Sequence, residues 1–347
     1  MAPPFHPLPG LKSAYWQTIL GSKLKFHREP KSKTHYVRLP DQDQLAIEVS
    51  HPKDWQTNEP TVMMIHGLGG CHRAGYMVRL AHKLLKAGYR VVRINLRGCG
   101  SGFGHAKKLY HGGLSDDILA VLQHHQTLCP ASSVTLVGFS LGGNMALKLA
   151  GELGDKGSDY LQQVIAVCPP IDLSHCSEMI GQPKNHTFRR YFMKKLKNTV
   201  RRRHLLFPDL PPPPKIRRFN MHLHQFDDTY TAPHAGFKNA EDYYQQASAI
   251  NVIDQIRVPC RMLFALDDPF IDSSILHQKK LPAHMELHLT EHGGHMGFLG
   301  SPRKPGGFRW MDHVLLNWIK HPPTLINNES AQQTPQTHRH SQTPAAD

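Results

Sequence analysis

Short apolar segments alternate with segments of helical pattern along this chain of 347 residues, and this alternation restricts the fold more than any other feature. Helical patterns at residues 74–87 and 115–126 lie between apolar segments that have the length and composition of buried strands. These strand-like segments are VMMIHG (62–67), YRVVRINL (89–96), SVTLVGFS (133–140), QQVIAVCPP (162–170) and CRMLFAL (260–266). Strands separated by helices at this spacing indicate βαβ units. We therefore predict an α/β fold with a mostly parallel central sheet and helices on both faces, preceded by a hairpin over residues 34–51.

The alternation is interrupted between about residues 173 and 248. This stretch holds a run of four prolines, the segment FDDTYTAPHAGF and the helical segment AEDYYQQAS. We predict that it is an insertion that covers the carboxyl ends of the strands as a cap. The expected organisation is one α/β domain over residues 1–321 that includes this cap. The remaining residues, 322–347, contain too few apolar side chains to pack, and we expect a disordered polar tail.

The cap carries most of the formal net charge of +14. Residues 181–218 contain twelve lysines and arginines against one acid, Asp209, which gives a net charge of +11 in 38 residues. Such a patch suits phosphate-bearing partners, and the alternative is a solvated face of the cap. We keep contact of residues 184–218 with an anionic membrane as a candidate interaction. No nucleic-acid partner is expected, because the segment shows no interleaved aromatic platform of the kind that single-strand binders use.

Composition also bears on the compartment. No apolar run approaches the ~20 residues needed to span a bilayer. The first residues, MAPPFHPLPG, lack the charged start and long apolar core of a secretory signal. Six scattered cysteines without a CxxC pair favour a reducing compartment. We therefore expect a cytoplasmic protein, with peripheral membrane contact as an addition.

The segment TLVGFSLGG contains a candidate nucleophile, Ser140. Residues 138–142 fit the pattern G-x-S-x-G, follow a predicted strand and open a predicted helix, as a nucleophile elbow requires. The turn is so tight that only small residues fit two positions before and after the serine. The N-terminus of the following helix places N–H groups and positive potential beside the hydroxyl. The alternative is a glycine-rich structural turn.

Two backbone N–H groups are predicted to form an oxyanion hole. One belongs to Leu141, the residue after the nucleophile. The other belongs to Leu68 in HGLGG, the loop that closes the strand at residues 62–65. His66 and Gly67 also suit a tight strand-ending turn, and both roles are compatible.

An acid and a base should follow the nucleophile in chain order. Asp267 and Asp268 both stand at the carboxyl end of the strand-like CRMLFAL segment, so the residues alone leave two candidates for the acid. His295, preceded by two glycines, stands in a loop where the base belongs.

The segment HMELHLTEHGGH contains four histidines, at positions 284, 288, 292 and 295, and raises the alternative of a metal site. Apolar and polar residues alternate over 284–290, a period of two that indicates a strand with His284 and His288 on its solvent side. On a strand these two lie about 13 Å apart. One zinc ion, with Zn–N bonds of about 2 Å, cannot join them. We therefore predict no metal site.

The chain resembles the YheT-type α/β-hydrolases, which are related to yeast ethanol acyltransferases and to mammalian lipid-hydrolysing members. The resemblance is carried by SAYWQTIL, HGLGG, NLRGCGSG, GFSLGGN, FDDTYTAPHAGF, DYYQQAS, DDPFI and GGHMGF, which span most of the chain. It implies an α/β-hydrolase fold and a Ser–Asp–His triad of Ser140, Asp268 and His295. Asp268 is favoured over Asp267 because Asp-x-x-Ile resembles the usual Asp-x-x-Val loop of these hydrolases.

The resemblance further implies a serine hydrolase that cleaves carboxylic esters, either short-chain esters or acylglycerol-type lipid esters, through an acyl-enzyme. Such chemistry needs no metal or organic cofactor. One alternative is an alcohol O-acyltransferase that uses the same triad. Another is a basic membrane- or nucleic-acid-binding protein that keeps the hydrolase fold without its activity. Arg97, Asp116 and Asp117 are expected to shape loops, with Ser115 as the N-cap of the helix that follows and the two aspartates in its first turn.

Overall fold

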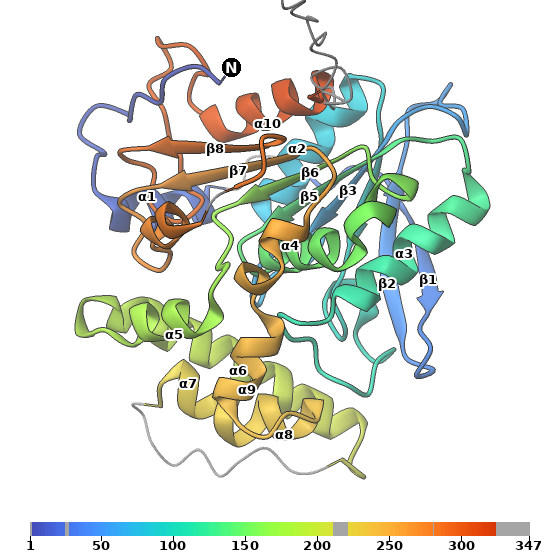
Figure 1. The fold of residues 1–347 in the computed structure, drawn as a ribbon, viewed down its shortest axis with the longest axis vertical. Coiled ribbons are helices and arrows are strands. Elements are labelled where there is room, and N and C mark those ends of the chain that lie inside the picture. Colours follow the sequence, from blue (N-terminus) through green and yellow to red (C-terminus); the bar gives the residue numbers. More distant parts are fainter. Residues whose placement is uncertain (1, 25–27, 211–220, 280, 324–347) are drawn as a thin grey trace, which may run out of the picture.

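An eight-stranded sheet forms the centre of the molecule (Figure 1). The computed structural model describes residues 2–24, 28–210, 221–279 and 281–323. The strands are β1 (Lys33–Arg38), β2 (Gln44–Ser50), β3 (Thr61–Ile65), β4 (Arg90–Ile94), β5 (Val134–Phe139), β6 (Gln163–Val167), β7 (Cys260–Ala265) and β8 (Met285–Thr290). Their order in the sheet is β1-β2-β4-β3-β5-β6-β7-β8. β1 and β2 form the predicted antiparallel hairpin, and β3 to β8 run parallel, so the predicted fold class is confirmed.

Helices cover both faces of the sheet, as the sequence predicts. The helices are α1 (Ala14–Lys23), α2 (Gly75–Lys86), α3 (Ser115–Leu128), α4 (Leu141–Leu153), α5 (Leu173–Gly181), α6 (His186–Leu206), α7 (Leu223–Phe226), α8 (Ala232–Ala235), α9 (Ala240–Ala247) and α10 (Trp310–Lys320). α2 and α10 pack with Val62, Met64 and Val137 on one face. α3 and α4 pack with the alternate residues Met63 and Leu136 on the other. Both faces are buried, which is why the parallel strands read as continuous apolar runs.

The helices α5 to α9 lie together at one end of the sheet (Figure 1). They have a small apolar cluster of their own, which includes Val200 and Tyr230. Phe188 and Tyr244, however, belong to the same buried cluster as the α4 side of the sheet. The separation of a cap at 173–248 from the rest of the domain stays a prediction. The proline run at 211–214 and the predicted tail from residue 324 onward lie outside the described residues.

None of the helices within the described ranges is both long enough and apolar enough to cross a membrane.

Two local predictions are wrong. His288 is half-buried and not solvent-facing as predicted, because α10 packs beside it and the imidazole stacks on Trp310 at 5.8 Å between ring centroids. Ser115 is the first residue of α3 and does not cap it; its hydroxyl contacts the carboxylate of Glu152 on α4 instead. In both cases a side chain from a distant segment replaces the solvent or local partner that the sequence pattern suggests.

Candidate active site

Ser140 lies on a strained turn between β5 and α4. Its backbone has φ 52° and ψ −122°, a conformation that L-residues rarely adopt. A Cβ atom at Gly138 would lie 2.2 Å from the carbonyl oxygen of Gly142. A Cβ atom at Gly142 would lie 2.5 Å from the carbonyl oxygen of Ile65 on β3. The two glycines of the G-x-S-x-G pattern are therefore required for the close approach of α4 to the sheet.

The structure brings Ser140, His295 and Asp268 together in one hydrogen-bonded chain. The Ser140 Oγ lies 2.9 Å from Nε2 of His295, and Nδ1 of His295 lies 2.8 Å from Oδ2 of Asp268. The Asp268 carboxylate also accepts the N–H groups of Phe270 and Ile271, at 2.9 and 3.2 Å. Its side chain is only 1% exposed. These bonds hold one carboxylate oxygen against the loop and leave the other for the imidazole.

Asp267 occupies a different place. Its Oδ1 accepts the N–H of Gly294 at 2.8 Å, and its Oδ2 lies 3.5 Å from Nδ1 of His292. Burial raises the pKa of this carboxyl above its usual range. Asp267 therefore positions the loop that carries His295 and does not contact the imidazole of His295 itself.

The backbone of His295 has a partner that the sequence does not reveal. Its N–H donates to the hydroxyl of Thr18 at 2.8 Å, and that hydroxyl donates to the carbonyl of Ala14 at 2.7 Å. Both residues lie on α1, and Thr18 stands 277 positions before His295 in the chain. Ala14 and Thr18 belong to the segment SAYWQTIL, which carries part of the family resemblance. That resemblance is the one feature of the sequence that could have pointed to this contact.

The predicted oxyanion donors lie beside Ser140. A Cβ atom at Gly67 would be 3.0 Å from Cβ of Ser140, so the loop before Leu68 passes close to the serine. Tyrosine hydroxyls accept the N–H groups on either side of Leu68: Tyr76 from Gly67 at 3.0 Å and Tyr110 from Gly69 at 2.8 Å. The intervening N–H of Leu68 and the N–H of Leu141 have no acceptor among the described residues. Leu141 is the first residue of α4, where an N–H has no intrahelical partner.

The buried side chain of His66 supports the loop that carries Leu68. It is fully buried, Nδ1 donates to the carbonyl of Gly67 at 2.8 Å, and Nε2 accepts the N–H of Leu96 at 3.2 Å. Burial lowers the pKa of the imidazole to about 4. The ring is therefore neutral at pH 7, and its two hydrogen bonds fix the loop after β3 against the end of β4.

The four histidines of residues 284–295 do not converge. His284 contacts the carbonyl of Ile256, His288 stacks on Trp310, and His292 and His295 pair with Asp267 and Asp268.

One other group of metal-type side chains occurs among the described residues: Cys168, Asp268 and His295, with ligand atoms within 4.8 Å of one another. Burial raises the pKa of the Cys168 thiol well above its usual range, so the sulfur stays protonated at neutral pH. A protonated thiol is a poor ligand, and Asp268 and His295 already bond to each other. This arrangement suits transfer of the Ser140 proton to His295 better than metal binding.

Comparison with known proteins establishes the family. Residues 60–302 match the family described by the alpha/beta hydrolase fold. YheT of Escherichia coli (strain K12) is 30% identical to this chain over 324 residues, which cover 91% of this chain and 92% of YheT. The chain belongs to the α/β-hydrolase family. The resemblance to YheT-type α/β-hydrolases is thereby confirmed.

Two further known proteins are similar to this chain. The medium-chain fatty acid ethyl ester synthase/esterase 2 of Saccharomyces cerevisiae (strain ATCC 204508 / S288c) is 30% identical over 310 residues, covering 80% of this chain and 67% of the yeast chain. The solved structure of 2,6-dihydroxy-pseudo-oxynicotine hydrolase matches with a TM-score of 0.54 and 18% identity, covering 84% of this chain and 67% of that one. The latter likeness shows the fold alone.

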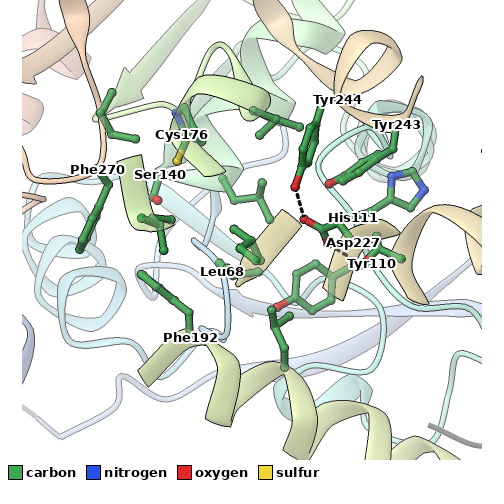
Figure 2. Close-up of a pocket in the computed structure, with 18 of the residues that line it drawn as sticks. Leu68, Tyr110, His111, Ser140, Cys176, Phe192, Asp227, Tyr243, Tyr244 and Phe270 are labelled. Atoms are coloured by element: carbon green, nitrogen blue, oxygen red, sulfur yellow. Dashed lines mark hydrogen bonds between the residues drawn. The ribbon is translucent and has the colours of Figure 1, made fainter. Parts of the chain in front are cut away.

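Two spaces meet at Ser140 and His295 in this α/β-hydrolase. An inner cavity of about 80 Å³ is lined mainly by apolar side chains, among them Leu68, Leu173 and Phe192 (Figure 2). An outer groove of about 530 Å³ runs between α1 and α6. Both lie against Ser140, His295, Phe192 and Phe270. An ester carbonyl at Ser140 could therefore extend one substituent into each space.

The inner cavity has a polar end away from Ser140 (Figure 2). Asp227 lies there and accepts the hydroxyls of Tyr244 at 2.8 Å and Thr231 at 2.6 Å. Burial raises the pKa of the Asp227 carboxyl to about 6. Asp227 belongs to the segment FDDTYTAPHAGF, which carries part of the family resemblance, but no pattern in the sequence predicts that its side chain reaches the cavity.

Proposed function

We propose that this α/β-hydrolase cleaves carboxylic esters through Ser140, His295 and Asp268, with an acyl-enzyme intermediate. The observation that carries the proposal is the hydrogen-bonded chain from the Ser140 hydroxyl through His295 to the buried Asp268 carboxylate. The order Ser…Asp…His along the chain is the order of α/β-hydrolases. The relatives include a protein named as an ester synthase and esterase, which agrees with ester chemistry.

The mechanism follows from this geometry. Nε2 of His295 takes the Ser140 proton as Oγ attacks the ester carbonyl, and Asp268 stabilises the resulting imidazolium. The N–H groups of Leu68 and Leu141 donate to the oxyanion, each worth about 3 kcal/mol of transition-state stabilisation in comparable sites. The imidazolium then protonates the leaving alcohol. Water attacks the acyl-enzyme with His295 as base, which releases the acid and restores Ser140.

The two spaces suggest the class of ester. The inner cavity, about 80 Å³, is much smaller than the outer groove of about 530 Å³, so we assign it the shorter substituent of the ester. The outer groove holds a longer apolar substituent along Ile19, Phe188 and Tyr191. We therefore propose a lipid-type or aliphatic ester with one short and one long substituent.

A p-nitrophenyl ester series from C2 to C16 tests this proposal. Ser140→Ala should lower kcat by about 10⁴-fold or more, because the nucleophile is removed while the remaining site persists. Ser158→Ala, at an exposed serine in the short 3-10 helix Gly154–Asp159 that follows α4, serves as the matched control and should keep full activity. Full activity in Ser140→Ala would overturn the proposal. The chain length at which wild-type kcat/KM falls shows which space receives the acyl group.

Acyl transfer to an alcohol is the second candidate, favoured by the yeast relative named as an ethyl ester synthase. The same acyl-enzyme would react with an alcohol in place of water. Product analysis with and without added ethanol separates the two activities. Hydrolysis predicts that acid remains the main product, whereas an excess of ethyl ester over acid supports transfer.

We also propose that α6 places the protein against anionic membranes. The helix exposes Tyr191 (53%), Leu205 (73%) and Leu206 (45%) among its lysines and arginines, and Trp16 of α1 is 51% exposed. Exposed apolar side chains within a basic helix are typical of interfacial binding. The protein should sediment with phosphatidylglycerol vesicles at low salt and less at high salt, and Leu205→Ser with Leu206→Ser should weaken sedimentation. Absence of sedimentation at low salt would exclude this contact.

A further inference from the structure

A second, basic groove lies beside the loop that carries Leu68. It has a volume of about 710 Å³ and is bounded by α6 and by two glycine-rich loops, residues 69–71 and 98–101. Leu68 lines the inner cavity, whereas the next residues, Gly69 to Cys71, line this groove. The groove therefore shares a loop with the candidate active site but does not include Ser140 or His295.

The groove is lined by cations without matching acids. Arg73, Lys195, Arg201 and Arg202 contribute to its wall, and no carboxylate does so among the described residues. Arg73 pairs with Glu29 at 3.0 Å, but no ion pair joins Lys195, Arg201 or Arg202 to an acid in the described ranges. Three uncompensated cations within two turns of one helix repel one another, and a bound anion relieves that repulsion.

Aromatic rings hold two of these cations in place. The guanidinium of Arg202 lies 3.9 Å from the ring centroid of Phe103, which also lines the groove. The ammonium of Lys195 lies 5.7 Å from the ring of Tyr191. A cation–π contact restricts the side chain without satisfying its N–H donors, so these donors remain available to an anion.

Glycines let the two loops pack closely on α6 and on Asn95 while their backbone lines the groove. Gly69 has φ +66°, and a Cβ atom there would lie 3.2 Å from Cβ of Lys195, so α6 packs directly on this loop. Gly100 has φ +54°, and a Cβ atom there would lie 2.2 Å from Oδ1 of Asn95. The N–H groups of Cys71 and Gly98 take no acceptor within the described part of the chain. Backbone N–H groups in glycine-rich turns are common components of phosphate sites.

We infer that this groove binds a phosphate group, carried either by a small soluble phosphate ester or by a lipid headgroup. Arginine guanidinium groups match phosphate oxygens in pairs, and the three cations without an acidic partner suit a dianion better than a single carboxylate. The volume exceeds that of inorganic phosphate, and Phe103 and Leu205 offer apolar contact to the organic part of the ligand. Binding at this groove needs no ester cleavage, so it stands or fails independently of the function proposed for Ser140.

The test is isothermal titration calorimetry of the whole chain at low salt with inorganic phosphate and with glycerol 3-phosphate. A groove variant carries Lys195→Gln, Arg201→Gln and Arg202→Gln. A matched control carries Arg190→Gln, Lys194→Gln and Lys197→Gln, which removes the same charge from α6 at residues that do not line the groove. Circular dichroism melting confirms that both variants are folded.

Saturable binding to the wild type should weaken by about tenfold for each cation removed from the groove and change less than threefold in the control. Competition by phosphatidylglycerol vesicles, but not by phosphatidylcholine vesicles, assigns the phosphate to a lipid headgroup; a lack of competition assigns it to a soluble ester. Two results overturn the inference: no saturable binding of either phosphate, or equal loss of binding in the groove and control variants.

Discussion

At the scale of single residues, the neighbouring carboxylates of Asp267 and Asp268 have different partners. Asp268 bonds to His295, and Asp267 bonds to the N–H of Gly294. We predict that Asp268→Asn lowers kcat by about 10⁴-fold, because an amide does not stabilise the imidazolium and favours the wrong tautomer. Asp267→Asn should change kcat by less than about tenfold and lower the melting temperature, since a backbone N–H loses a charged acceptor.

Steady-state kinetics on a p-nitrophenyl ester and thermal melting of both variants check this prediction. The two substitutions are matched in size and charge and differ by one position. The opposite ranking of kcat would transfer the role of acid to Asp267.

At the scale of elements, Arg97 joins three parts of the fold that are remote in sequence. Its guanidinium binds both carboxylate oxygens of Asp117 on α3, at 2.6 and 2.7 Å. It also binds Asp41 and Asp43 in the β1–β2 turn, each at 2.7 Å. Arg97, which the sequence predicts to shape a loop, therefore connects the β1–β2 hairpin and α3 to the loop after β4.

Removing this cation should leave buried carboxylates without a partner. We predict that Arg97→Met lowers the free energy of unfolding by about 3–5 kcal/mol, the range for breaking a buried ion pair from one side. Lys108→Gln, which removes an exposed cation from the same Asp41, should cost less than about 1 kcal/mol. Urea denaturation measures both, and equal losses would contradict a special role for Arg97.

At the scale of the whole molecule, buried histidines make stability depend on pH. Burial lowers the pKa values of His66, His111 and His125 to about 4 in the folded protein. In the unfolded chain these imidazoles take up protons near pH 6.5, whereas in the folded protein they stay neutral down to about pH 4. The free energy of unfolding is therefore undiminished above pH 6.5 and decreases as the pH falls from 6.5 toward 4. Asp227 has the opposite effect on the free energy of unfolding. Its pKa of about 6 in the folded protein lies above the usual value of a carboxyl, so the folded state binds a proton before the unfolded state does as the pH falls.

We predict that the free energy of unfolding falls between pH 6.5 and 4 by about 1.4 kcal/mol per pH unit for each net proton taken up on unfolding. His125→Gln should reduce this slope by about one proton. His313→Gln, at an exposed position on α10, should leave it unchanged. Urea titrations at several pH values provide the slopes, and an unchanged slope in His125→Gln would refute the contribution of that ring.

The sequence by itself determined the order of strands and helices and the positions of Ser140, His295 and the aspartate pair at strand ends. These features are local, because the spacing of apolar residues, the spacing of glycines and the order of residues along the chain do not depend on contacts between distant segments. The position of His288 was misjudged because the period of a strand does not tell which helix packs over it.

Only the tertiary structure decided which side chains meet. Asp268 contacts the imidazole of His295, whereas Asp267 contacts the N–H of Gly294, and the hydroxyl of Thr18, 277 positions earlier, accepts the N–H of His295. The tertiary structure also brought Asp227 to the end of the inner cavity and the cations of α6 to two glycine loops. Such contacts join segments far apart in the chain, and they arise from the packing of helices on a sheet, which no local pattern encodes.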